Sequence, residues 1–282
     1  MEPRAKTVLG LTARGFHRIR YWEWGDPANG RVLICVHGLT RNGRDFDAVA
    51  RVLCGRYRVL CPDVAGRGDS DWIDPSDYGY PQYCADMAKL IARSGADAVD
   101  WLGTSMGGLI GMFLAAQDKT PVRRLVLNDV GAMVPKAALE EIARYVADNP
   151  EFDSVEAAAD YIAAVNAGFG RLTRAQWLGL ARTTVARRDD GKYVWKRDPA
   201  IGRSFVAQPR DDISFWPVWD RVRCPVLVLR GAASPLLTAA TAEEMTRRGP
   251  RARLVTIPDA GHAPALLAET EIGPIREFLF AD

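Results

Sequence analysis

Ser105 stands in a setting that suits a nucleophile. It lies in the stretch G-T-S-M-G at 103–107, which fits the pattern G-x-S-x-G. Val99, Trp101 and Leu102 before it indicate the end of a buried strand, and apolar residues at helical spacing follow it. Glycine on both sides suits a sharp turn from strand to helix, because a Cβ at either position would collide with the neighbouring backbone. The spacing therefore predicts a serine hydroxyl raised at the edge of a sheet, with a helix N-terminus facing any oxyanion that develops there.

The chain has three histidines, His17, His37 and His262. We expect His17 at the surface of an N-terminal hairpin, and we expect His37, which directly follows an apolar strand, to shape a loop. His262 follows the last apolar strand in a Gly-His loop, which would lie over the same sheet edge as Ser105. We therefore assign His262 as the general base that takes the proton from the Ser105 hydroxyl.

The elements that must position these side chains alternate along most of the chain. Patterns typical of strands occur at 16–24, 31–36, 57–61, 99–102, 124–127, 225–229 and 252–257. Helical spacing of apolar residues occurs at 45–54, 80–94, 108–116, 241–248 and 272–280. Strands that alternate with helices at this spacing predict an α/β fold with a doubly wound, mostly parallel sheet.

Residues 135–215 break this rhythm. Helical patterns follow one another at 137–148, 154–167 and 173–187, without a buried strand between them. The segment is rich in aromatic residues, most of which we expect to pack helix against helix. A helical insertion can also cover a pocket at the carboxyl edge of a sheet, so we predict a lid whose side chains Phe169, Trp177 and Trp195 line an acyl pocket.

Four local patterns together resemble the α/β-hydrolase superfamily, and its capped carboxylesterase-type members most. They are H-G-L at 37–39, D-V-A-G-R-G-D-S at 63–70, G-T-S-M-G-G at 103–108 and G-H at 261–262. The resemblance covers essentially the whole chain and implies a hydrolase core at 1–134 and 216–282, with the lid at 135–215 between its two parts. It also implies a cofactor-free reaction through an acyl-enzyme. By the same resemblance, the backbone N–H groups of Leu39 and Met106 would form the oxyanion hole.

The acid that should orient His262 departs from the pattern of most relatives. Where they resemble R-G-x-x-S-D-L-L, this chain reads R-G-A-A-S-P-L-L, with Pro235 in the place of the aspartate. Neither Ser234 nor Pro235 can orient an imidazolium as a carboxylate does. Asp129, just after a predicted strand, resembles the acid position of some dehalogenase-type relatives, but it could equally cap a turn. Asp259 is a poorer candidate, because it shares the loop of His262.

Composition argues against several other classes of function. Hydrophobic residues make up 48% and charged residues 26%, with a formal net charge of +2, so we expect no nucleic-acid or membrane partner. No signal peptide is visible and no apolar run is long enough to span a membrane. The five cysteines form no C-x-x-C pair, and no zinc or nucleotide motif is present. We expect a cytoplasmic enzyme that acts on a small-molecule ester without cofactor or metal.

Three functions remain compatible with these residues. The first is a serine carboxylesterase for small or medium apolar acyl esters, which uses the Ser105 and His262 pair. The second is a C–C bond hydrolase or an acyltransferase, since the same serine and histidine chemistry serves both and the lid selects the substrate. The third is a catalytically impaired binding protein, which the missing carboxylate at position 235 would explain.

Overall fold

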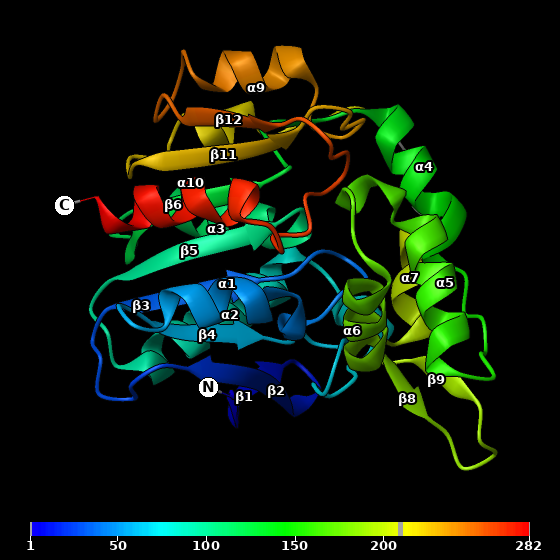
Figure 1. Cartoon of the computed structure of the whole chain (residues 1–282). Helices are drawn as coiled ribbons and strands as arrows, with labels where there is room; N and C mark the ends of the chain where they lie inside the picture. The colour runs from blue at the N-terminus through cyan, green and yellow to red at the C-terminus, as the bar shows by residue number, and fades with distance from the viewer. Residues whose placement is uncertain (1, 208–210, 282) are drawn as a thin grey trace.

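A single large sheet organises the molecule. The structure, a computed structural model, describes residues 2–207 and 211–281. Within these residues the sheet has eight strands in the order β1–β2–β4–β3–β5–β6–β11–β12 (Figure 1). The strands are β1 (Arg4–Thr12), β2 (Gly15–Trp24), β3 (Val32–Val36), β4 (Arg58–Pro62), β5 (Val99–Thr104), β6 (Val122–Asn128), β11 (Val226–Gly231) and β12 (Arg253–Ile257). The six strands from β4 to β12 pair in parallel, whereas β1 pairs with β2 and β2 with β4 in antiparallel fashion. The predicted doubly wound, mostly parallel sheet is confirmed.

Helices cover both faces of this sheet. They do so because successive residues of the central strands point to opposite faces and nearly all of them are apolar. In β3, the side chains of Val32, Ile34 and Val36 join one hydrophobic core, and those of Leu33 and Cys35 join the other. The helices of the sheet layers are α1 (Asp47–Leu53), α2 (Tyr80–Ser94), α3 (Met106–Ala115), α8 (Trp216–Trp219), α9 (Ala239–Met245) and α10 (Glu269–Phe280), with 3-10 turns η1 (Gly43–Phe46) and η2 (Pro75–Asp77). Helices α1 and α10 pack on one face, and α2, α3, α8 and α9 on the other.

Several elements differ from the sequence-based prediction, among them the first strand of the sheet and the last of the helices predicted at 135–215. The sequence did not predict strand β1, because the strand lacks the regular alternation of buried and exposed residues that marks a half-buried strand. Leu9 and Leu11 are exposed, and the strand forms by pairing with β2. The helix predicted at 173–187 ends at Thr184, and Val185–Arg187 instead forms strand β8, which pairs with β9 (Tyr193–Trp195). The chain can leave a helix at a β-branched residue and form a strand when another strand is present to pair with it. The local spacing of apolar residues does not reveal that pairing strand.

The segment between β6 and β11 lies beside one end of the sheet (Figure 1). It contains β7 (Met133–Val134), α4 (Lys136–Val146), α5 (Val155–Val165), η3 (Ala167–Phe169), α6 (Arg174–Thr184), β8, β9, α7 (Pro199–Ala207) and β10 (Ile213–Ser214). Strands β7 and β10 pair with each other and so close the base of the segment. A small hydrophobic core of its own, which includes Phe152, Ile162 and Ala181, holds its helices together. We refer to residues 135–215 as the inserted segment.

His17 does not lie at the surface, as the sequence led us to expect. Its side chain is buried between β2 and α2, and its Nε2 lies 2.9 Å from Asp86 Oδ2. The expectation was wrong because position 17 faces α2, which packs across the N-terminal hairpin. The pair fastens this hairpin to the core and lies apart from the residues predicted to carry chemistry.

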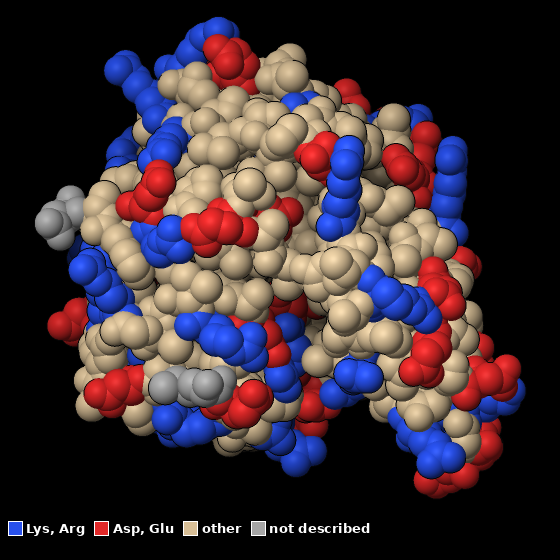
Figure 2. Space-filling model, viewed as in Figure 1, with Lys and Arg blue, Asp and Glu red and all other residues tan. Residues whose placement is uncertain are grey.

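The surface carries acidic and basic side chains in mixed order. In the view of Figure 2, neither sign gathers into one continuous field. This distribution fits the near-neutral formal charge of +2. Among the described residues, no helix has both the length and the apolar character needed to cross a bilayer.

Candidate active site

Ser105 forms the sharp turn between β5 and α3. Its backbone angles are φ 51° and ψ −117°, an unusual conformation for a residue with a side chain. The turn brings backbones close together, since a Cβ on Gly107 would lie 2.0 Å from Val36 O and one on Gly103 2.2 Å from Gly107 O. Both glycines are therefore required by close approach, as the sequence pattern predicted.

Ser105, His262 and Asp129 lie in one hydrogen-bonded row. His262 Nε2 is 3.0 Å from Ser105 Oγ, and His262 Nδ1 is 2.7 Å from Asp129 Oδ2. The side chain of Asp129 is fully buried, and that of His262 is 17% exposed. In this geometry Nδ1–H donates to the carboxylate, which leaves the Nε2 lone pair facing the serine hydroxyl.

The loop after β11 supports the Asp129 carboxylate instead of supplying a carboxylate of its own. The Gly231 N–H donates to Asp129 Oδ1 at 2.8 Å, and the Ser234 hydroxyl donates to Asp129 Oδ2 at 2.5 Å. The Ser234 oxygen in turn accepts the backbone N–H groups of Leu236 and Leu237. Ser234, next to Pro235, thus holds a carboxylate that comes from the end of the neighbouring strand.

The alternative roles of the acidic residues find less support. No described hydrogen bond joins the Asp129 carboxylate to its own turn, so a role as a local turn cap does not account for its contacts. The Asp259 side chain is 62% exposed and lies 3.5 Å from Arg171 Nη2. Asp129 is therefore the carboxylate that the structure brings to His262.

His37 shapes the loop that carries Leu39. It is fully buried, its Nδ1–H donates to Gly38 O at 2.7 Å, and its Nε2 accepts the Val64 N–H at 2.9 Å. Burial lowers the pKa of His37 to about 3, so the ring is neutral at ordinary pH. The expected structural role of His37 is confirmed by these contacts.

Leu39 and Met106 both flank Ser105. Met106 is the first residue of α3, and a Cβ on Gly38, next to Leu39, would lie 3.7 Å from Ser105 Cβ. Within residues 2–207 and 211–281, neither N–H group is used in a hydrogen bond to the protein. Two free N–H donors beside a serine hydroxyl are the arrangement that an oxyanion requires.

Comparisons with known proteins agree with this geometry. The alpha/beta hydrolase family matches residues 33–271. A 3-hydroxybutyrate-oligomer hydrolase from Cupriavidus necator is 45% identical over 98% of this chain and 98% of its own length. The crystal structure of an alpha/beta hydrolase from Novosphingobium aromaticivorans has a TM-score of 0.86 and 35% identity, and the match covers 98% of each chain.

The chain belongs to the alpha/beta hydrolase family. An esterase from Mycobacterium tuberculosis is also 30% identical, over 86% of this chain and 79% of its own length. The predicted membership of this family and the prediction of an enzyme are therefore confirmed. The predicted roles of individual residues are taken up as proposals below.

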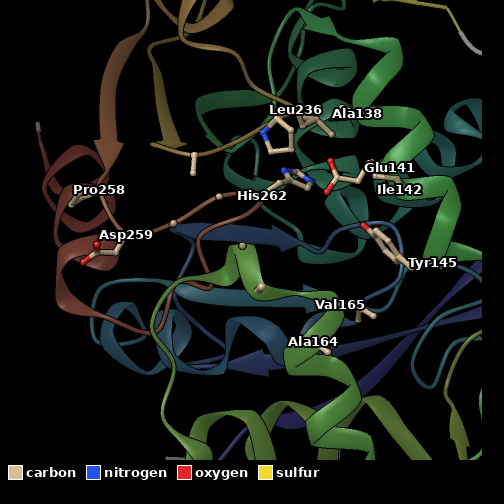
Figure 3. A pocket seen from close by; sticks show the side chains of 16 residues that line it. Ala138, Glu141, Ile142, Tyr145, Ala164, Val165, Leu236, Pro258, Asp259 and His262 are labelled. Carbon is tan, nitrogen blue, oxygen red and sulfur yellow. The ribbon is translucent and has the colours of Figure 1, made fainter.

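Three cavities meet at Ser105 and His262 in this hydrolase. A cavity of about 680 Å³ is lined by His262 and by Glu141 and Tyr145, which project from α4 toward it (Figure 3). A narrow cavity of about 70 Å³ is lined by both Ser105 and His262. An apolar cavity of about 220 Å³ reaches Ser105 from the other side. The site therefore offers separate spaces on the serine side and on the histidine side.

The three aromatic residues predicted to bind substrate lie in different places. Phe169 lines the narrow cavity together with Ser105. Trp177 stacks on Phe169, with ring centroids 6.0 Å apart, and it lines none of the three cavities at Ser105. Trp195 packs against Phe152 within the inserted segment and lines a fourth, smaller cavity.

The apolar cavity is lined mainly by residues that the sequence did not single out. They are Tyr80, Leu109, Val130, Val134, Leu139, Ile142, Phe215 and Leu236, with others. Apolar residues at helical spacing are indistinguishable from ordinary core residues in a sequence. Neither this cavity nor any other part of the described chain holds a group of three His, Cys, Asp or Glu side chains placed for a metal ion.

Proposed function

We propose that this enzyme cleaves carboxylic esters with short acyl groups through a covalent acyl-enzyme on Ser105. The observation that carries the proposal is the row of Ser105, His262 and Asp129, with contacts of 3.0 and 2.7 Å. A serine whose hydroxyl faces a histidine, itself oriented by a buried carboxylate, is the arrangement of an activated nucleophile. The same contacts argue against an impaired binding protein, because the carboxylate absent at position 235 is present at position 129.

In the first half of the reaction, Ser105 Oγ attacks the ester carbonyl carbon and its proton passes to His262 Nε2. The carbonyl oxygen becomes an oxyanion, which the N–H groups of Leu39 and Met106 stabilise; one such donor is worth about 3–4 kcal/mol in transition-state stabilisation. Asp129 stabilises the imidazolium without taking its proton. The intermediate then expels the alcohol, which takes the proton from Nε2, and leaves an ester on Ser105.

In the second half, water repeats these steps. His262 Nε2 takes a proton from water while the water oxygen attacks the acyl-enzyme, and the same two N–H groups hold the new oxyanion. The carboxylic acid then leaves and Ser105 recovers its proton. Every step uses groups of this chain and water.

The size of the apolar cavity supports a short acyl group. Its volume of about 220 Å³ is below the range of about 300–1,000 Å³ that is common for sites of drug-sized ligands. The relative from Cupriavidus necator, named for 3-hydroxybutyrate oligomers, makes esters of small hydroxy acids the substrate class that we favour. In this proposal the inserted segment acts as the lid, since Leu139 and Ile142 of α4 help to line the cavity.

The test compares p-nitrophenyl acetate, butyrate and octanoate as substrates of the wild type and of two serine variants. Ser105→Ala should lower kcat by roughly 10⁴-fold or more, because residues that act as a unit in catalysis lose most of the rate when one is removed. Ser76→Ala, at an exposed serine, is the matched control. If Ser105→Ala keeps the wild-type rate, the proposal is wrong.

A further inference from the structure

One arginine lines the space between Ser105 and His262, and a second lines a cavity that shares residues with it. The narrow cavity that both catalytic side chains line is also lined by Arg41. A fourth cavity, of about 20 Å³, shares Arg41 and Tyr145 with it and adds Arg197. The narrow cavity between Ser105 and His262 therefore adjoins a smaller cavity, and two guanidinium groups line these two spaces.

Arg197 is buried without an acidic partner. It is only 8% exposed, its Nη2 donates to the backbone oxygen of Asp148 at 2.7 Å, and no salt bridge joins it to a described Asp or Glu. Burial lowers its pKa to about 10, and the nearby charges of Arg67 and Arg41 act in the same direction. A guanidinium in such surroundings is costly unless an anion pairs with it.

The neighbouring charges do not compensate for Arg197. Arg41 is 7% exposed, and its Nε–H and Nη2–H groups donate hydrogen bonds to the carboxylate of Asp45 at 2.8 and 2.6 Å. Its Nη1 has no partner among the described residues. Arg67 is fully buried and donates only to uncharged oxygen and sulfur atoms. Three guanidinium groups thus share this region with one directly paired carboxylate.

Trp195 adds a further unsatisfied donor to the fourth cavity. Its indole Nε1–H is buried and has no acceptor among the described residues, although its ring lies 5.5 Å from the guanidinium carbon of Arg197. Buried donors without an acceptor are rare in folded proteins, and each one needs an explanation. The excess positive charge and the unused donors point to the same missing group, an anion with several acceptor oxygens.

We propose that Arg41 and Arg197 bind a free carboxylate on the leaving-group side of the substrate. Guanidinium groups match a carboxylate in shape and charge, and such charge-assisted hydrogen bonds are the strong ones in proteins. This inference rests on the proposed ester hydrolysis. It adds that the preferred substrate is an ester whose alcohol part is itself a short acid.

An oligoester of a hydroxy acid has this chemistry at one end. Its terminal unit carries the free carboxylate, and the hydroxyl of that unit forms the last ester bond. When Ser105 attacks the carbonyl of this bond, the terminal unit is the alcohol that His262 protonates. Its carboxylate then extends along the narrow cavity, which Arg41 lines, toward Arg197 in the adjoining cavity, and the acyl part occupies the apolar cavity. The enzyme would release hydroxy acid from the carboxyl end.

The test uses the linear dimer of 3-hydroxybutyrate as the free acid, the same dimer as its methyl ester, and p-nitrophenyl butyrate. The two dimers contain the same internal ester bond and differ in the charge of the terminal group. The wild type should have a kcat/KM for the free acid that is roughly ten- to a hundredfold higher than for cleavage of the same bond in the methyl ester. This comparison needs no variant.

Variants then assign the discrimination to the arginines. Arg197→Gln should lower the ratio of the two kcat/KM values several-fold toward one, because only Arg41 then remains, and Arg197→Lys, which keeps the charge but loses the planar fork, should give an intermediate ratio. Arg187→Gln, at an exposed arginine of β8, is the matched control and should keep the wild-type ratio. Because the readout is a ratio within one variant, a general loss of activity does not mimic the result.

The outcomes separate this inference from the function on which it rests. Equal cleavage of the two dimers by the wild type, with p-nitrophenyl butyrate still hydrolysed, would overturn the carboxylate subsite alone. An unchanged ratio in Arg197→Gln would also overturn it. If no ester is hydrolysed, the proposed function fails and the subsite fails with it.

Discussion

Replacing Asp129 with asparagine tests the most unusual feature of the site. In the wild type, Asp129 Oδ1 accepts the Gly231 N–H, and Oδ2 accepts both the Ser234 hydroxyl and His262 Nδ1–H. A carboxylate can accept at both oxygens, but an amide has one oxygen and one NH₂. Either orientation of the new amide therefore sets a donor against a donor, at Gly231 or at His262.

The expected loss in rate follows from these contacts. If the amide oxygen faces Gly231, its NH₂ faces His262 Nδ1, and the favoured tautomer then has its proton on Nε2, where the base must be free. Replacing a triad aspartate with asparagine in a well-studied protease lowered kcat about 10⁴-fold, which corresponds to about 5.5 kcal/mol at about 1.4 kcal/mol per tenfold. We expect Asp129→Asn to approach this loss, with KM changed much less.

The assay is kcat on p-nitrophenyl butyrate, with circular dichroism to confirm that each variant is folded. Asp259→Asn, at the exposed carboxylate in the loop of His262, is the matched control and should keep the wild-type kcat. Pro235→Asp places an acid where the resemblance to the α/β-hydrolase superfamily led us to look for one, and it should not raise the rate. A large gain from Pro235→Asp, or an Asp129→Asn variant that retains most of its activity, would refute the reasoning.

Two further predictions concern the buried histidine and the apolar cavity. The pKa of His37, lowered to about 3 by burial, means that the unfolded chain binds a proton below about pH 6.5 that the folded protein does not bind. Between pH 7 and pH 5 the wild type should therefore lose about 2 kcal/mol more unfolding free energy than His37→Gln, at about 1.4 kcal/mol per pH unit, in urea titrations; equal losses would contradict this. Leu139→Phe should fill part of the cavity and lower the ratio of butyrate to acetate ester hydrolysis by roughly tenfold, whereas Leu11→Phe, at an exposed position of β1, should leave it unchanged. An unaltered ratio in Leu139→Phe would place the acyl group elsewhere.

The sheet and the serine turn could be predicted because their signals are local. The continuous apolar run of β3 is needed wherever a parallel strand is covered on both faces, and the glycines around Ser105 are needed wherever a strand turns sharply into a helix. Strand β1 and the end of α6 depend instead on pairing partners across a hairpin, β2 for β1 and β9 for the strand β8 that follows α6. No pattern within a short window records such a partner.

The carboxylate that contacts His262 could not be decided from the sequence, because its partners are brought together only by the order of the strands. Asp129 and His262 are 133 residues apart, and Asp129 follows β6, which pairs in parallel with β11. That pairing places Asp129 beside Gly231 and Ser234. The loop after β11 has no carboxylate of its own, but these two residues donate hydrogen bonds to the carboxylate of Asp129. Arg41 and Arg197, which we propose bind a carboxylate, were missed for a related reason, since a buried arginine and a solvated one look alike in a sequence.

The identity of the nucleophile is the central claim, and a covalent label tests it most directly. A fluorophosphonate should react with the wild type to give one adduct by intact mass, because a tetrahedral phosphonate on Ser105 Oγ would accept the Leu39 and Met106 N–H groups as the reaction's oxyanion does. Peptide mapping should place the adduct on Ser105, and Asp129→Asn should label far more slowly. An adduct at another residue, or no adduct with an enzyme that hydrolyses esters, would contradict the account.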